Sequence, residues 1–272
     1  MSSDATVLAA LDEGGDLGGR AASLAVRVLL PALTIVGLVG LWWLAVVLFG
    51  WKPFLVPTPK GVWDELVAQR EILPGHVETT LVETLEGFAL AIAIAVPVAV
   101  ASAYSRVLEA TIYPALVALN AIPKIAIAPL LVIWMGFGLG PKVVMVVLIC
   151  FFPIVISTAT GLKATPAELV ELSRSLPSSA LQEFVRFRFP WSLPYVFVGL
   201  KVAITLAVIG AVVGEFVGAT KGLGYVIVAS GQTADTTLAF AAVVLLSIMS
   251  ILLFYGIALV QRVLVPWSEE QA

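Results

Sequence analysis

Few residues in this sequence could do chemistry within its long apolar runs. Asn120 and Lys124 interrupt one run, and Glu215 lies near the end of another. A polar or ionisable group in such a setting is costly to bury without a partner, so it indicates a functional site by default. We therefore predict that Asn120, Lys124 and Glu215 line a pathway for a solute. A structural role for Glu215 stays open: it could pair with Lys124 or Lys221, or accept hydrogen bonds from the glycine-rich turn that follows it.

The composition shows what must surround these residues. The chain has 272 residues, of which 60% are hydrophobic and 12% charged, whereas soluble domains carry about 25% charged residues. No soluble core could hide this much apolar surface, so lipid must solvate most of the chain. The net charge of -3 provides no basic surface for nucleic acid.

Catalytic signatures are missing from the sequence. It has no phosphate-binding G-x-x-x-x-G-K-[ST] loop, and no Ser/His or paired-Asp arrangement occurs within the apolar runs. The one histidine, His76, has no neighbouring metal-ligand residues, and we interpret it as a surface residue. The one cysteine, Cys150, excludes an internal disulfide and is expected to pack as a small apolar residue. We expect no enzyme activity, no metal site and no cofactor in this chain.

The apolar runs predict an all-α, polytopic membrane protein with about six spans, since a helix needs about 20 residues to cross a bilayer. The predicted spans are 25–50, 87–104, 111–136, 143–162, 195–217 and 238–260. The third span contains Asn120, Pro123, Lys124 and Pro129, so it should face protein or a water-filled path rather than lipid.

The distribution of lysine and arginine predicts the orientation. With the N-terminus in the cytosol, nine of these residues lie on the cytosolic side and five outside. We therefore expect both termini in the cytosol. We divide the chain into a disordered acidic tail (1–23), a transmembrane domain (24–265) with a cytosolic loop (164–194), and a C-terminal tail (266–272).

The cytosolic loop is the most polar insert between two spans. Thr165 to Glu168 form a predicted capping box, and the helix should run to about Leu176, where Pro177 ends it. Ser179 and Gln182 form a second predicted box that starts another short helix, ending near Phe187. An amphipathic loop of this kind either lies on lipid headgroups or inserts into a groove of a partner protein.

A motif in this loop distinguishes the two possibilities. Glu171-Leu172-Ser173, then Pro177, then Pro190 resembles the EAA loop of binding-protein-dependent ABC importer permeases. That family has Gly where this chain has Pro177, and Ile and Leu where it has Phe187 and Phe189. The resemblance implies that the loop contacts an ATPase, through the residues Glu168, Glu171, Leu172, Ser173, Leu176, Pro177, Ser178 and Pro190.

The resemblance extends along the chain to the nitrate/sulfonate/taurine branch of these permeases. It rests on segments such as 53–59, 121–124, 134–138, 214–216 and 221–225. It implies a type I importer in a bacterial inner membrane. The implied partners are a second, identical permease copy, two cytosolic ATPase subunits that hold ATP and Mg²⁺, and an extracytoplasmic solute-binding protein.

The solute is less defined. The branch implies a small anion such as a sulfonate, nitrate or taurine. Many such members have Arg at the position of Glu83, and the exchange favours heterocyclic solutes such as pyrimidines or riboflavin. Alternatively, Glu83 lies at the headgroups. A different function also stays open: an ion-gradient-driven secondary transporter, which predicts paired intramembrane carboxylates and an internal repeat.

Overall fold

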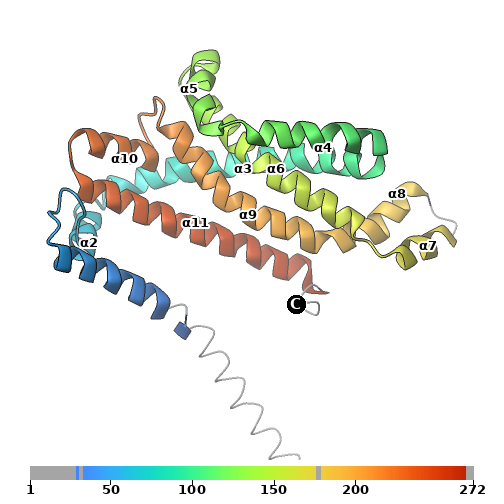
Figure 1. Ribbon diagram of the computed structural model, residues 1–272, viewed down its shortest axis with the longest axis horizontal. Helices are drawn as coiled ribbons and strands as arrows, with labels where there is room; N and C mark the ends of the chain where they lie inside the picture. Colours follow the sequence, from blue (N-terminus) through green and yellow to red (C-terminus); the bar gives the residue numbers. More distant parts are fainter. Residues whose placement is uncertain (1–28, 31–32, 176–178, 268–272) are drawn as a thin grey trace, which may run out of the picture. The chain divides into compact units, whose positions relative to one another are not determined.

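The computed structural model describes residues 29–30, 33–175 and 179–267, and all regular elements among these residues are helical (Figure 1). It contains two units, residues 1–64 and 65–272. In the first, an apolar helix spans Leu33–Phe49, and the ring of Phe49 stacks on Trp51 at 5.1 Å. The predicted tail 1–23 lies outside the described residues, as do residues 268–272 of the predicted C-terminal tail.

A short helix, α2 (Pro59–Ala68), connects to the second unit, which holds most of the chain. Its elements are α3 (Leu73–Tyr104), α4 (Arg106–Ala121), α5 (Lys124–Met135), α6 (Leu139–Lys163), α7 (Ala167–Ser175), α8 (Ala180–Glu183), the π-helix η1 (Phe184–Arg188), α9 (Phe189–Glu215), α10 (Leu223–Gln232) and α11 (Thr236–Leu264).

Within the described residues, four helical segments are long and apolar enough to cross a membrane, which confirms four of the predicted spans. They are α3, α6, α11 and the continuous run Leu181–Glu215. The predicted third span is broken: Ala110–Ala121 and Lys124–Met135 meet at 90°. Pro123 lies at this break, where a proline cannot continue the preceding helix. For the predicted first span, the helix within the described residues is Leu33–Phe49.

The second span begins earlier than the sequence indicated. We predicted that the second span begins at residue 87, but α3 starts at Leu73 and includes residues 73–86. The polar residues Thr80, Glu83 and Thr84 are buried on the same helix as Ala91 and Ala95. Their spacing of three and four residues puts them on the packed face, so this part of α3 belongs to the protein interior.

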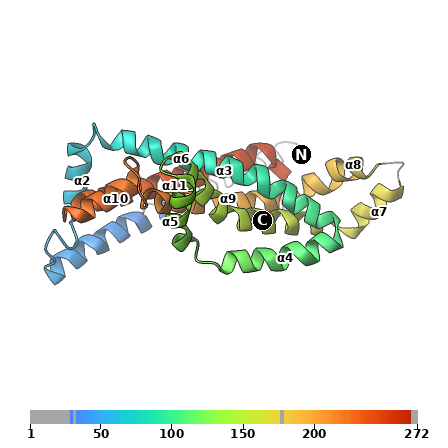
Figure 2. The ribbon, with the colours of Figure 1, turned by 90° about the horizontal axis from the view of Figure 1, so that it is seen from above.

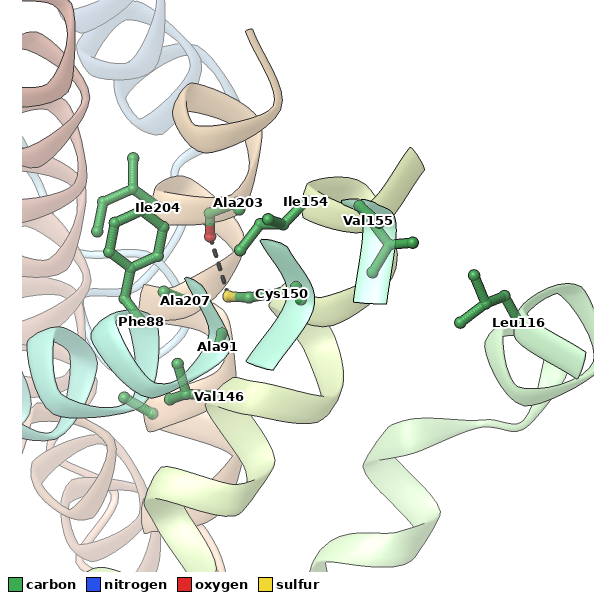
Figure 3. Close-up of a cluster of buried hydrophobic side chains, with 13 residues drawn as sticks. Phe88, Ala91, Leu116, Val146, Cys150, Ile154, Val155, Ala203, Ile204 and Ala207 are labelled. Carbon is green, nitrogen blue, oxygen red and sulfur yellow. Dashed lines mark hydrogen bonds between the residues drawn. The ribbon is translucent and has the colours of Figure 1, made fainter. Parts of the chain in front are cut away.

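Small residues set the packing of α3, α6 and α9. A Cβ added at Gly210 of α9 would come within 2.8 Å of the Val146 Cα, and one at Gly87 of α3 within 2.4 Å of the Val146 Cβ. Small residues allow such close backbone approach between membrane helices. Figure 3 shows the core between the three helices, where Cys150 lies 3.1 Å from the Ala203 carbonyl. Cys150 is fully buried, as predicted for a small apolar residue.

The two ends of this helical body differ. The short helices α7 and α8 lie at one end of α6 and α9, and α10 lies at the other end (Figures 1 and 2). The predicted loop and the glycine-rich turn are therefore separated by the length of the long helices.

Candidate functional site: a loop for a partner and a polar break in a span

Helix α7 presents one face of the loop to solvent. Glu168 lies in its first turn. Glu171 is exposed, and so is Leu172, with 52% of its surface accessible. Ser173 is buried, and its hydroxyl donates to the Val170 carbonyl at 2.8 Å. The predicted helix is thus confirmed as far as Ser175, which leaves Glu171 and Leu172 free to contact another protein.

The predicted end of this helix lies outside the described residues, because Leu176, Pro177 and Ser178 belong to the gap 176–178. At its beginning, the hydroxyl of Thr165 donates to the Leu162 carbonyl at 3.2 Å. The Thr165 side chain thus serves the end of α6, whereas the sequence predicted that it caps α7.

The second capping box forms as predicted. The amide of Gln182 donates to Ser179 Oγ at 3.3 Å, and the amide of Ser179 donates to Gln182 Oε1 at 2.9 Å. The helix that it starts does not end near Phe187, as the sequence suggested. It continues through the π-helix η1 into α9, with Pro190 in the first turn of α9, where a missing N–H costs little. The loop is therefore continuous with a membrane span.

Aromatic and charged side chains attach the loop to the end of α3. Arg188 lies 5.4 Å from the ring centroid of Tyr104 and pairs with Glu183, with Nε and Oε1 at 2.8 Å. Phe184 meets the edge of the same Tyr104 ring at 5.9 Å. A cation over an aromatic face and an edge-to-face ring pair are each attractive. Tyr104 therefore holds both Arg188 and Phe184 against α3.

A second attachment joins the loop to α6. Trp191 Nε1 donates to the Ala164 carbonyl at 3.2 Å. One turn further along, a Cβ at Gly161 would lie 2.7 Å from the Tyr195 Cβ and 2.9 Å from the Ser192 carbonyl oxygen. The end of α6 and the beginning of α9 are thus in close contact, so both spans hold the base of the loop.

The loop exposes apolar side chains that no described part of the chain covers. Leu172 on α7, Leu181 on α8 and Val185 on η1 are 52%, 70% and 53% exposed, respectively. We call these three residues the loop face. Exposed apolar residues on a polar segment between two spans are compatible with a protein-protein contact.

The break between α4 and α5 brings two predicted pathway residues together. Lys124 Nζ lies 2.5 Å from Asn120 Oδ1. Both residues line a cavity of about 280 Å³, whose wall also includes Phe151 and Phe152 of α6. A mostly apolar cavity with few polar groups is typical of a small-molecule site.

Glu215 lies away from the cavity beside Asn120 and Lys124. It is 2% exposed, and its carboxylate accepts hydrogen bonds from the Thr80 hydroxyl at 2.7 Å and the Gly224 amide at 2.5 Å. The amide of Leu223 in turn donates to the Thr80 hydroxyl at 2.8 Å. Of the alternatives left open, the structure shows the backbone cap of the glycine-rich turn, and it does not bring Glu215 to Asn120 or Lys124.

Two residues near this turn were misjudged. Glu83 is 3% exposed and pairs with the buried Lys142 at 2.5 Å, so it lies neither at the headgroups nor in an open pathway. His76 is half-buried rather than on the surface: it stacks on Tyr225, and its Nδ1 accepts the Gly222 amide. Nothing in the sequence signalled the Glu83–Lys142 pair, since 59 positions separate its members. We call Thr80, Glu83, Lys142 and Glu215 the carboxyl cluster.

Comparison with known proteins agrees with this arrangement. Residues 87–269 match the model of the family described as the binding-protein-dependent transport system inner membrane component. The chain belongs to this family, and it is a permease subunit of an ABC importer. Permeases of this class work with ATP-hydrolysing subunits and a solute-binding protein. Family membership decides against the secondary transporter, and the several apolar helices make this a multi-pass membrane protein.

Individual relatives cover nearly the whole chain. A probable ABC transporter permease of Haemophilus influenzae is 36% identical over 85% of this chain and 95% of its own length. The formylaminopyrimidine transport permease ThiX of Halalkalibacterium halodurans is 35% identical over 89% and 96%. The taurine permease TauC of Escherichia coli is 26% identical over 90% and 91%.

A solved structure shares the fold. The inward-facing MetNI methionine ABC transporter matches with a TM-score of 0.65 and 22% identity, over 72% of this chain and 98% of the matched chain. The predicted type I importer fold is confirmed.

Proposed function

We propose that two copies of this chain form the solute pathway of a bacterial inner-membrane importer, and that each loop docks on one of two cytosolic ATPase subunits. ATP and Mg²⁺ are held by those subunits. The observation that carries this proposal is the loop face, which is exposed although Tyr104 and Trp191 fix the loop to two spans. A rigidly held apolar surface is suited to transmit force from a partner.

Docking can be tested by co-purification. Leu181→Asp, with Leu172→Asp as a second variant, should abolish capture of the ATPase subunit by a tagged permease, because each places a charge in the contact. Leu55→Asp is the matched control, since Leu55 is also exposed, at 57%, but lies outside the loop. Undiminished capture by both loop variants would contradict the docking surface.

We infer the orientation from the same docking, since ATPase subunits are cytosolic. Both termini then lie in the cytosol. The test is labelling of Ser179→Cys in intact cells with a thiol reagent that does not cross membranes. Cys150 is the only native cysteine and is buried, so background labelling is low. Labelling from outside would overturn the orientation.

We propose that the solute is a small heterocycle or organic acid that passes Asn120 and Lys124. The cavity beside these residues offers one ammonium, one amide and aromatic walls, which fit a flat molecule with an anionic or acceptor group. The riboflavin permease RibX of Chloroflexus aurantiacus is 36% identical and ThiX 35%, against 26% for TauC, so a heterocycle is favoured over a sulfonate.

Uptake experiments test this pathway. A thermal-shift screen of the cognate binding protein identifies the solute first. Lys124→Met should then lower uptake at least about 10-fold, since a charge-assisted hydrogen bond contributes about 1.5–3 kcal/mol. Lys221→Met is the control, because Lys221 is an exposed lysine outside the cavity, and it should leave uptake unchanged. Equal uptake by the two variants would exclude Lys124 from the pathway.

A further inference from the structure

The carboxyl cluster has an excess of negative groups. Glu83 from α3 and Glu215 from α9 belong to one buried site, because Thr80, three residues before Glu83 on α3, donates to Glu215. Lys142 from α6 is the cation of this site and pairs with Glu83. The side chains of Glu83 and Lys142 are 4% and 11% exposed, and Glu215 is 2% exposed. If both carboxyl groups were ionised, one negative charge would remain buried without a counter-charge, which is strongly unfavourable.

The hydrogen bonds show which oxygen lacks a donor. On Glu215, Oε1 accepts from Thr80 and Oε2 accepts from the Gly224 amide. On Glu83, Oε1 accepts from Lys142 Nζ. Oε2 of Glu83 is buried without a hydrogen-bond partner. Buried polar atoms are nearly always satisfied, so an unpaired carboxyl oxygen beside a second carboxylate requires an explanation.

We propose that one proton resides on Oε2 of Glu83 and is donated to the carboxylate of Glu215. This single proton supplies the missing donor and makes the cluster of Glu83, Glu215 and Lys142 electrically neutral. A metal ion fits less well, because within the described part of the chain no three His, Cys, Asp or Glu residues gather to hold one.

Among the residues that the structure describes around the pair, none is a second candidate for the proton. Thr80 faces it from α3 and already bridges Glu215 and the Leu223 amide. His76 is engaged at Nδ1 by the Gly222 amide rather than by a carboxylate. Lys221 in the turn is exposed. With the proton on Glu83, Glu215 stays ionised. Its carboxylate can then accept hydrogen bonds from both Thr80 and the Gly224 amide and hold the turn before α10.

The two glutamates therefore differ in what can replace them. In Glu83→Gln, the amide oxygen can accept from Lys142 while the amide NH₂ donates to Glu215, so it imitates the protonated acid. In Glu215→Gln, an NH₂ group would face the Thr80 hydroxyl or the Gly224 amide, and one donor would lose its acceptor. We expect the melting temperature of Glu83→Gln to stay within about 2 °C of the original and that of Glu215→Gln to fall by roughly 3–10 °C.

Infrared spectroscopy tests the proton directly on the purified transporter in nanodiscs, with no transport assay. A protonated carboxyl has a C=O stretching band that an ionised one lacks. The difference spectrum between the original protein and Glu83→Gln should show this band at neutral pH. Glu86→Gln is the matched control, because Glu86 is exposed on the same helix, and its difference spectrum should lack the band.

Three results would overturn the proposal. The first is the absence of the band from the Glu83→Gln difference spectrum. The second is a band that disappears in Glu215→Gln but persists in Glu83→Gln, which would place the proton on Glu215. The third is failure of Glu83→Gln to assemble while Glu86→Gln assembles normally, because the amide preserves both hydrogen bonds that the proposal assigns.

Discussion

The contact between α6 and α9 predicts a large effect from adding one methyl group. In Gly210→Ala, the new Cβ would lie 2.8 Å from the Val146 Cα and 3.3 Å from the Val146 N. Ordinary contact begins at 3.4 Å, so the Cα approach is too short by 3.4 minus 2.8, or 0.6 Å. Because the Val146 Cα belongs to the backbone, no side-chain rotation can relieve the overlap, and the two helices must separate.

Separation of the helices loses packing along their interface. Overpacking of a well-packed core costs about 1–3 kcal/mol. Replacing Gly by Ala in a helix also contributes up to about 1 kcal/mol of stabilisation. Gly256→Ala on α11 measures this second effect, since nothing lies within 4 Å of a Cβ built at Gly256. The difference between the two variants isolates the overlap, and it corresponds to roughly 2–10 °C in melting temperature.

The assay is thermal unfolding of the detergent-solubilised permease. Samples of a fluorescent fusion are heated, and size-exclusion chromatography then measures how much folded protein remains. Gly210→Ala should melt below the original protein, and Gly256→Ala at or above it. Equal melting temperatures for the two alanine variants would refute the idea that close backbone approach of α6 and α9 stabilises the fold.

Three further outcomes follow from local geometry. Gly222→Ala should lower the free energy of unfolding by about 3 kcal/mol or more, since φ is 114° and the new Cβ would lie 2.1 Å from Glu215 Oε1. The variant should then fail to assemble with its partners in a pull-down, and a normal yield of the assembled complex would contradict this. Trp191→Phe keeps an aromatic ring but loses the hydrogen bond to the Ala164 carbonyl, and should lower stability in a melting assay by about 0.5–1.5 kcal/mol; an unchanged melting temperature would show that this bond is not needed. Ser179→Ala removes a helix cap worth about 1 kcal/mol, and hydrogen exchange of residues 180–183 should accelerate about 5-fold with little change elsewhere; unchanged exchange would argue against the cap.

The sequence was sufficient for several features that follow a local rule, although the predicted cap at Thr165 was not among them. The reciprocal bonds of Ser179 and Gln182 follow from the identity and spacing of these two residues. The break in the third span follows from its proline and polar residues, and the long apolar runs predict four of the other spans.

Where the outcome depended on tertiary packing, the sequence was insufficient. The beginning of α3 at Leu73 was missed because its polar residues are satisfied by distant partners, as Glu83 is by Lys142. The role of Glu215 depended on the return of Gly224 to its carboxylate. Continuation of α8 into α9 required a π-helix, for which residues 184–188 give no recognisable pattern.

The glycine contacts have a mechanical consequence. Besides Gly210, Gly199 of α9 would bring a Cβ within 2.4 Å of the Ser157 Cβ, and Gly87 of α3 abuts Val146. Helices that fit together at this distance cannot slide without breaking backbone contacts at several levels at once. α3, α6 and α9 should therefore move together as one rigid body. Tyr104 lies at the end of this body that contacts the loop, and Glu215 lies at the opposite end.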